Sequence, residues 1–368
     1  MKPDLNTVTD KVRSGVRISP AEAETLWREA PLSLLGSLAC EIKRRKSGDA
    51  VYYNRNFHIE PTNICIFRCR FCSYRRLAGE PGAWNYSLEE IENLARARKG
   101  SDVTEVHIVG GVHPDHDLDY YIDMIRRVKA ILPEVTVKAF TAIELAYMIE
   151  KAGIGFDEGL RRLKDAGMAA IPGGGAEIFD EELRARICPE KGDSRTWLAL
   201  HRAAHGIGLK TNATMLYGHV ETVSQRIDHL DRLRRLQDET GGFDAFIPLK
   251  FRRAGNLLGE GLEEVPVTED MRTLAMSRIY LDNFPHIKAY WVMYGKQTAE
   301  MALTFGADDI DGTIDDTTKI YSMAGAEDKP RLTVNEIETM AASAGLRAVE
   351  RDTFYNEIRR IPDTEQGR

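Results

Sequence analysis

The segment Cys65-Ile66-Phe67-Arg68-Cys69-Arg70-Phe71-Cys72 places three thiols on one short stretch, in the spacing CxxxCxxC. Iron–sulfur clusters are held by cysteine thiolates, and three thiolates leave the fourth iron of a 4Fe-4S cluster without a protein ligand. An open coordination position is typical of a reactive metal site and not of a structural one. The spacing therefore predicts that Cys65, Cys69 and Cys72 hold a reactive 4Fe-4S cluster.

Two other interpretations of these cysteines stay open. A structural zinc site usually has four ligands in two pairs; this segment has no matching second pair, although His58 is close enough in the sequence to complete a zinc set. A disulfide would require an oxidising compartment, for which the sequence offers no secretory context. Cys40 and Cys188 stand alone and are expected to be small buried apolar residues.

The composition argues against several classes of protein. The chain has 368 residues, and its net charge of -7 argues against nucleic acid as a partner. No apolar stretch approaches the roughly 20 residues of a membrane span, and the N-terminal residues lack the features of a signal peptide. Because three of the five cysteines share one segment, a reducing cytoplasm is the expected location.

Beyond the cysteines, strand-like and helical patterns alternate. Eight strands are predicted over residues 57–61, 105–111, 135–141, 168–172, 209–215, 245–249, 287–293 and 309–313. Helical patterns cover residues 88–98, 118–132, 156–166, 194–206, 222–239, 268–284, 297–305 and 334–345. Such alternation implies parallel strands covered by helices, and eight strands fit a closed (β/α)8 barrel of the TIM type. We predict an N-terminal helical extension over residues 1–50 and a barrel with a C-terminal helical segment over residues 51–368.

Polar residues and glycines follow the strands of this predicted barrel. Active sites of such barrels lie at the C-terminal ends of the strands, and the residues found there are Gly110, Gly111, Thr141, Glu144, Glu177, Asn212, Thr214, His219, Lys250, Arg252, Arg253, Tyr290, Tyr294, Asp311 and Thr313. The glycines either turn the chain or allow close approach to a ligand. Glu177 is a ligand candidate because a carboxylate can accept both hydroxyls of a ribose. The cations are either a solvated edge or partners of substrate carboxylates.

The cysteine segment, with Phe71 before its third cysteine, resembles the radical S-adenosylmethionine (SAM) superfamily. Five further segments resemble the aminodeoxyfutalosine synthase family of the futalosine route to menaquinone: residues 58–65, 110–115, 172–179, 210–219 and 319–326. The resemblance extends from about residue 52 into the C-terminal region. It implies a TIM-type barrel, a 4Fe-4S cluster, and SAM as a co-substrate.

The resemblance also assigns residues. Cys65, Cys69 and Cys72 match the cluster ligands, and Phe71 matches the residue beside the adenine of SAM. The remaining matches are these: Gly110 and Gly111 lie in the segment that meets the methionine amino group, Glu177 at a position that meets the nucleoside, and Thr141 at a substrate contact.

The reaction implied by the resemblance starts with 3-[(1-carboxyvinyl)oxy]benzoate. The 5′-deoxyadenosyl radical of SAM adds to its double bond, and loss of a carboxyl group gives 6-amino-6-deoxyfutalosine. Two substrate carboxylates would explain a cationic rim on an acidic protein, so we expect substrate contacts among Lys210, Asn212, His219, Lys250, Arg252, Arg253 and Tyr290. A reducing donor such as flavodoxin or ferredoxin would supply electrons. The alternative is a cyclic dehypoxanthine futalosine synthase, which acts by hydrogen abstraction.

Overall fold

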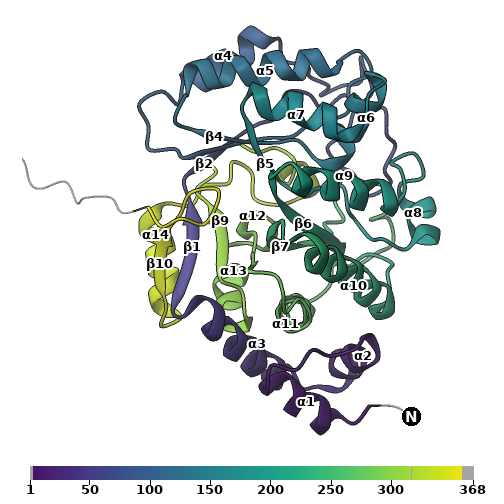
Figure 1. Ribbon diagram of the computed structural model, residues 1–368, viewed down its shortest axis with the longest axis vertical. Coiled ribbons are helices and arrows are strands. Elements are labelled where there is room, and N and C mark those ends of the chain that lie inside the picture. Colours follow the sequence, from purple (N-terminus) through teal and green to yellow (C-terminus); the bar gives the residue numbers. More distant parts are fainter. Residues whose placement is uncertain (1–2, 316, 359–368) are drawn as a thin grey trace, which may run out of the picture.

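A curved sheet of seven parallel strands forms the centre of the computed structural model (Figure 1), which describes residues 3–315 and 317–358. The strands pair in the order in which they follow along the chain. They are β2 (Asn56–Ile59), β3 (Glu105–Ile108), β4 (Thr136–Ala139), β5 (Met168–Ile171), β6 (Lys210–Tyr217), β7 (Phe243–Lys250) and β8 (His286–Ile287). Residues 359–368, the end of the predicted barrel, lie outside the described residues.

The eighth predicted strand, β9 (Asp309–Gly312), lies beside β8 but belongs to a second sheet. A bridge between Lys288 and Asp309 joins it to the end of β8, and its main pairing is with β1 (Ala50–Asn54), which also pairs with β10 (Arg347–Glu350). Asp311 has a φ of 75°, a left-handed backbone that interrupts a regular ladder. The prediction of a TIM-type fold is confirmed, while strand pairing does not close the barrel between β9 and β2.

Helices follow most strands and cover the outside of the sheet (Figure 1). They are α4 (Leu88–Arg96), α5 (Leu118–Ile131), α6 (Ala142–Lys151), α7 (Phe156–Ala166), α8 (Glu181–Ile187), α9 (Ser194–Gly206), α10 (Val223–Thr240), α11 (Val267–Tyr280), α12 (Trp291–Tyr294), α13 (Lys296–Ala302) and α14 (Val334–Ser343), with short 3-10 turns η1 (Leu303–Phe305) and η2 (Ser322–Ala324). The sequence did not predict α6, α8, α12 or β10. Residues 291–293 were wrongly predicted as strand, because a short apolar run has no period that separates strand from buried helix.

Three N-terminal helices precede the barrel. The second packs against α10 and α11, the third packs against α11, and the first packs against the other two. They are α1 (Leu5–Arg13), α2 (Pro20–Glu29) and α3 (Leu32–Ser47). Their buried apolar residues, such as Val8, Leu26 and Leu35, belong to the same core as the barrel helices. The division of the chain at residue 50 therefore stays a prediction, since no break in packing marks it.

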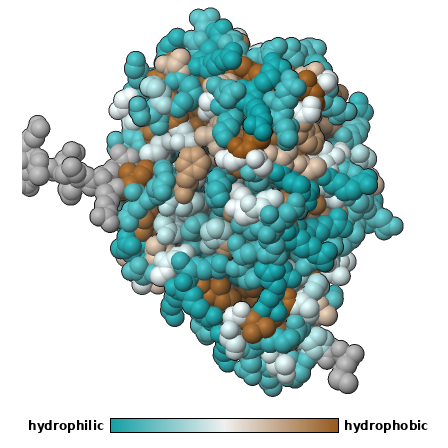
Figure 2. All heavy atoms as spheres, in the orientation of Figure 1, coloured by the Kyte–Doolittle hydropathy of each residue, from teal (hydrophilic) through white to brown (hydrophobic). Residues whose placement is uncertain are grey.

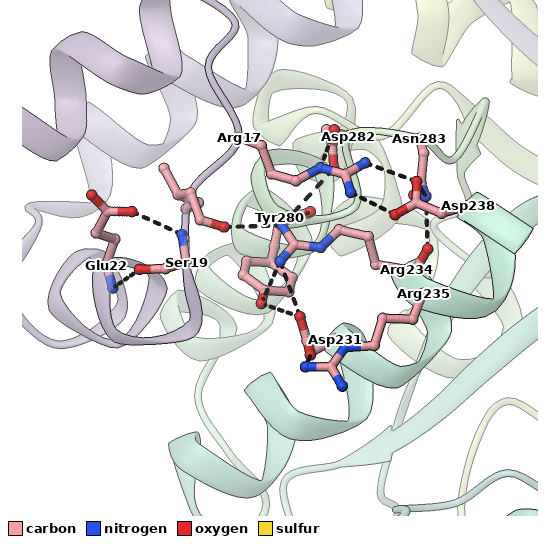
Figure 3. Close-up of polar contacts among 11 residues, drawn as sticks. Arg17, Ser19, Glu22, Asp231, Arg234, Arg235, Asp238, Tyr280, Asp282 and Asn283 are labelled. Atoms are coloured by element: carbon pink, nitrogen blue, oxygen red, sulfur yellow. Dashed lines mark hydrogen bonds and ion pairs between the residues drawn. The ribbon is translucent and has the colours of Figure 1, made fainter.

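A polar network ties these N-terminal helices to the barrel (Figure 3). The Arg17 guanidinium lies between Asp238 and Asp282, with Nη2 2.9 Å from one oxygen of Asp238. Nearby, Ser19 and Glu22 form the capping box that begins α2. The face of the molecule in Figure 2 is mostly hydrophilic, with small separate apolar patches. Within the described residues, no helix has both the length and the apolar character needed to cross a membrane.

Candidate active site

The cysteine loop follows β2 and is held from three sides. The N–H of Cys65 donates to the Arg76 carbonyl at 3.1 Å, that of Ile66 to Val112 at 3.0 Å, and that of Arg70 to Ile187 at 2.8 Å. These contacts come from the loop itself, from the residues after β3 and from the end of α8. The loop therefore lies at the C-terminal ends of the strands, where TIM-type barrels carry their active sites.

The three thiols suit a cluster better than a single ion. All five cysteines are free, and across the described residues no three His, Cys, Asp or Glu side chains are close enough together to hold one metal ion. Each cysteine of a 4Fe-4S cluster binds a different iron, so its thiolates stand farther apart than the ligands of one zinc ion. His58 does not complete a zinc set with these cysteines, because its side chain is buried inside the barrel against the His107 ring at 4.6 Å.

The two cysteines outside the loop differ from each other. Cys40 is half-buried and donates to the Thr304 carbonyl at 3.1 Å, so the prediction of a buried apolar residue is wrong for it. Cys188 is buried as predicted, but it is not isolated in space. A hydrogen bond between the thiols of Cys69 and Cys188 raises the pKa of Cys69 and lowers that of Cys188.

A cavity of 270 Å³ opens beside the loop and extends into the barrel. Most of the residues predicted for the site line it: Phe71, Cys72, Gly110, Thr141, Glu177, Asn212, Thr214, Lys250, Arg252, Tyr290 and Asp311. The convergence of the strand ends thus brings together residues that are far apart in the sequence.

The other predicted residues do not line this cavity: Cys65, Cys69, Gly111, Glu144, Lys210, His219, Arg253, Tyr294 and Thr313. Lys210 is the first residue of β6, at the opposite end of the barrel, where its amine donates to the Gly241 carbonyl at 3.0 Å. The His219 ring is fully enclosed against the Leu216 carbonyl and Glu221. These two substrate contacts are therefore wrong, because both side chains are bound to the protein away from the cavity.

The glycines after β3 allow the loop to pack closely. A Cβ on Gly111 would lie 2.4 Å from the Ile64 carbonyl oxygen, and one on Gly110 would lie 2.8 Å from that of Thr62. Only glycine permits this approach of the two backbones. The N–H of Gly110 also donates to the Glu144 carboxylate at 3.0 Å. Both glycines thus position the cysteine loop, and Gly110 in addition faces the cavity.

Lys191 is a site residue that the sequence analysis missed. Its amine lies 2.5 Å from the Glu177 carboxylate and 5.2 Å from the centre of the Phe71 ring. Burial alone would lower the pKa of Lys191, but Glu177 and the nearby thiols raise it above its usual value. Lys191 follows α8 on a loop with no motif of its own, so only the fold brings this cation beside the cysteines.

Charged residues also line the deep part of the cavity. Lys138 on β4 pairs with Glu105 on β3 at 2.8 Å, and Lys288 after β8 pairs with Asp311 on β9 at 2.6 Å. The His58 ring nitrogens and Nε2 of His107, all buried, have no hydrogen-bond partner among the described residues. Unpartnered buried polar atoms usually meet water or a ligand, so this end of the cavity suits a polar group.

The pairing of Glu105 with Lys138 predicts a pH dependence of stability. Burial alone would raise the pKa of Glu105, but Lys138 with Arg351 and Lys288 lowers it to about 2. The unfolded carboxyl, with a pKa of about 4.3, binds its proton first as the pH falls. The stabilisation is therefore present above that pKa and is lost as the pH falls towards about 2.

A Lys138→Met variant should lose this dependence. Between about pH 5 and about pH 3, its free energy of unfolding should fall less steeply with decreasing pH than that of the parent protein. Urea denaturation at several pH values measures the slopes. Lys129→Met is the control, because among the described residues Lys129 donates only to the carbonyls of Pro133 and Val135. Parallel slopes for the Lys138→Met and parent proteins would contradict the prediction.

Two polar groups near the mouth of the cavity have no partner. The hydroxyl of Tyr290 and Nε of Arg252 are buried without a hydrogen bond among the described residues. Arg252 is held in place by its Nη2, which donates to the Gly325 carbonyl at 2.9 Å, and by its Nη1, which lies 3.4 Å from the Glu264 carboxylate. The amine of Lys250 differs from Nε of Arg252, because it already donates to Asp270 at 2.8 Å and to the Val265 carbonyl at 2.9 Å. Arg252 and Tyr290 are therefore better placed than Lys250 to meet a ligand.

Comparison with known proteins agrees with this geometry. Residues 59–233 match the radical SAM superfamily, and residues 240–365 match the CofH/MqnC C-terminal region. An aminodeoxyfutalosine synthase of Thermus thermophilus is 42% identical over 97% of this chain and 96% of that enzyme. The chain belongs to the aminodeoxyfutalosine synthase family of radical SAM enzymes. Membership implies a 4Fe-4S cluster and SAM.

The sequence identities of further relatives help to choose between the two candidate reactions. An aminodeoxyfutalosine synthase of Streptomyces coelicolor is 41% identical over 97% of this chain and 95% of that enzyme. A cyclic dehypoxanthine futalosine synthase from the same organism is 34% identical, over 97% and 90%. The crystal structure of methylornithine synthase (PylB) matches with a TM-score of 0.73 at 18% identity, over 93% of this chain and 97% of that one, which shows a shared fold. The order favours the synthase over the hydrogen-abstracting alternative.

Proposed function

We propose that this protein joins the adenosyl group of SAM to 3-[(1-carboxyvinyl)oxy]benzoate, with loss of one carboxyl group, to give 6-amino-6-deoxyfutalosine. The observation that carries this proposal is that Cys72 and Glu177, from loops far apart in the sequence, line the same enclosed cavity. Identity of 41–42% with two synthases over nearly the whole chain supports the choice of reaction.

Cys65, Cys69 and Cys72 would hold the cluster at the mouth of this cavity. When bound, the cluster and SAM supply the 5′-deoxyadenosyl radical that adds to the substrate. Phe71 offers a flat apolar surface for the adenine, and the Glu177 carboxylate can accept the ribose hydroxyls. Lys191 would hold Glu177 in position, since its amine is already paired with that carboxylate.

The two substrate carboxylates need hydrogen-bond donors inside the cavity. Arg252 and Tyr290 present an unpartnered N–H and hydroxyl near the mouth. Lys138 and Lys288 line the deep part, where each is already paired with a carboxylate of the protein. Thr141 and Asn212 line the wall between them. We infer that one carboxylate lies against Arg252 and Tyr290, because a guanidinium N–H gives a charge-assisted hydrogen bond to a carboxylate. An iron–sulfur cluster needs free thiols as its ligands. We therefore propose a reducing cytoplasm as the location of this protein.

Product analysis tests the reaction. The protein is purified anaerobically, reconstituted with iron and sulfide, and incubated with SAM, dithionite and the enolpyruvyl benzoate. Mass spectrometry should detect a product that contains the adenosyl group, formed only when the benzoate is present. Release of 5′-deoxyadenosine with no adduct would overturn the proposal and favour hydrogen abstraction.

A further inference from the structure

A groove runs along the outer side of the cysteine loop, opposite the cavity. Its walls are the loop and residues 253–260, which are joined by a hydrogen bond of 2.8 Å from the Leu258 N–H to the Arg70 carbonyl. Cys69 and Cys72 both reach the groove, and Cys72 lines the inner cavity as well. The cysteine loop is therefore the wall between the cavity and the protein surface.

The groove is cationic, although the chain as a whole is acidic. Five arginines line it with only two glutamates: Arg68, Arg70, Arg75, Arg76 and Arg253 against Glu80 and Glu260. Across the described residues, only Arg253 of these five forms an ion pair, and its partner Glu263 is 89% exposed. The chain has a net charge of -7, so a groove lined by several unpaired arginines would not be expected from its overall charge.

The arginines differ in how they are held. Arg68 and Arg70 are exposed, and their side chains make no hydrogen bond within the described part of the chain. Arg76 is half-buried and donates to the carbonyls of Ser73 and Arg75 at 2.9 and 2.7 Å. The groove thus has one arginine held by the protein and two exposed arginines whose side chains are unpaired, and an acidic partner could supply carboxylates to these two.

We propose that this groove is the docking surface for a small acidic electron-transfer protein that reduces the cluster. The inference rests on the proposed function, because it needs a cluster on Cys65, Cys69 and Cys72. In the step, the reduced donor loses one electron and the cluster gains it, and no atom is exchanged. Charge complementarity identifies the partner as acidic. The net negative charge of the whole chain disfavours nucleic acid, and Leu257, 61% exposed at the groove, adds the apolar contact typical of a protein interface.

A charge-reversal variant tests the docking surface. In Arg68→Glu/Arg70→Glu, the second-order rate constant for cluster reduction by a reduced acidic flavodoxin should fall at least about tenfold at low salt. The difference should shrink at about 1 M salt, because salt screens exposed charges. Stopped-flow absorbance of the reconstituted enzyme measures the rate. The backbone N–H groups of both residues, which hold the loop, are unchanged.

Controls separate this inference from the proposed function. Arg126→Glu/Arg161→Glu carries the same charge change on the exposed faces of α5 and α7 and should react with flavodoxin at the parent rate. Dithionite should reduce both double variants, and both should then form adduct, at the parent rate. Failure of the parent enzyme to form adduct with dithionite would sink the proposed function. Equal flavodoxin rates in the groove variant and the parent, with adduct formed normally, would overturn the docking surface alone.

Discussion

Replacing Cys72 with alanine should reduce adduct formation by more than about a hundredfold, because loss of residues that merely support a metal ligand already costs 10- to 100-fold. Cys72 lines both the cavity and the outer groove, so a cluster bound there would lie between the substrate and the donor. Burial raises the pKa of the Cys72 thiol; bound iron has to replace its proton. Iron and sulfide content after anaerobic reconstitution, with mass spectrometry of the product, measures the effect. Cys65→Ala and Cys69→Ala should behave in the same way.

Cys40→Ala is the matched control for this prediction. Cys40 lies on α3, where its thiol meets the Thr304 carbonyl, and its loss should leave iron content and adduct formation at the parent level. Thermal unfolding of the cluster-free proteins checks that each variant is folded. Full iron content and full activity in Cys72→Ala would show that another thiol completes the ligand set. Cys188, whose thiol is hydrogen-bonded to that of Cys69, would then be the first residue to test.

Replacing Arg278 with methionine should lower the free energy of unfolding by about 3–5 kcal/mol, since the buried Asp308 carboxylate would lose its guanidinium partner. Among its neighbours, the His286 ring and the Ile287 N–H would still contact that carboxylate. Arg278 and Asp308 are fully buried and form an ion pair. The same guanidinium donates to the carbonyls of Gly306 and Pro285 at 2.8 and 3.0 Å. Asp308 in turn accepts from the Ser47 hydroxyl at the end of α3. The pair thus joins α11, β9 and the N-terminal helices.

Arg272→Met, on the same helix, is the control for Arg278→Met. Arg272 donates to the carbonyls of Trp27 and Ala30 at 2.9 Å and forms no ion pair within the described residues. Its loss should cost about 2 kcal/mol, since the usual net value of one hydrogen bond is about 1 kcal/mol and two are removed. Because a domain is stable by only about 5–15 kcal/mol, urea denaturation separates the two outcomes. An equal loss in both variants would contradict a special role for the buried pair.

Most of the fold could be predicted because its signals are local. The capping boxes that begin α2, α4 and α14 join residues three apart, such as Ser87 and Glu90, and a few neighbouring side chains decide them. β10 and α12 could not be predicted in this way. β10 is a strand because Ala50 pairs with Arg347, and α12 has no side-chain cap, so contacts with distant segments decide both.

The residues of the candidate site also fall into two groups, those that local sequence predicts and those that only distant contacts place. The sequence by itself predicted the three cysteines from their spacing, Glu177 from its carboxylate and the close approach at Gly110 and Gly111 from the absence of a side chain, because these signals are visible within a few residues. The role of Phe71 followed from the family resemblance. The tertiary structure alone decided that Lys191 pairs with Glu177 and that Lys210 lies at the end of the barrel opposite the predicted site. It also decided that Lys138 and Lys288 line the cavity. The reason is physical: whether a charged side chain in a strand is paired, buried or exposed depends on the neighbouring strands, which the order of residues along one strand does not encode.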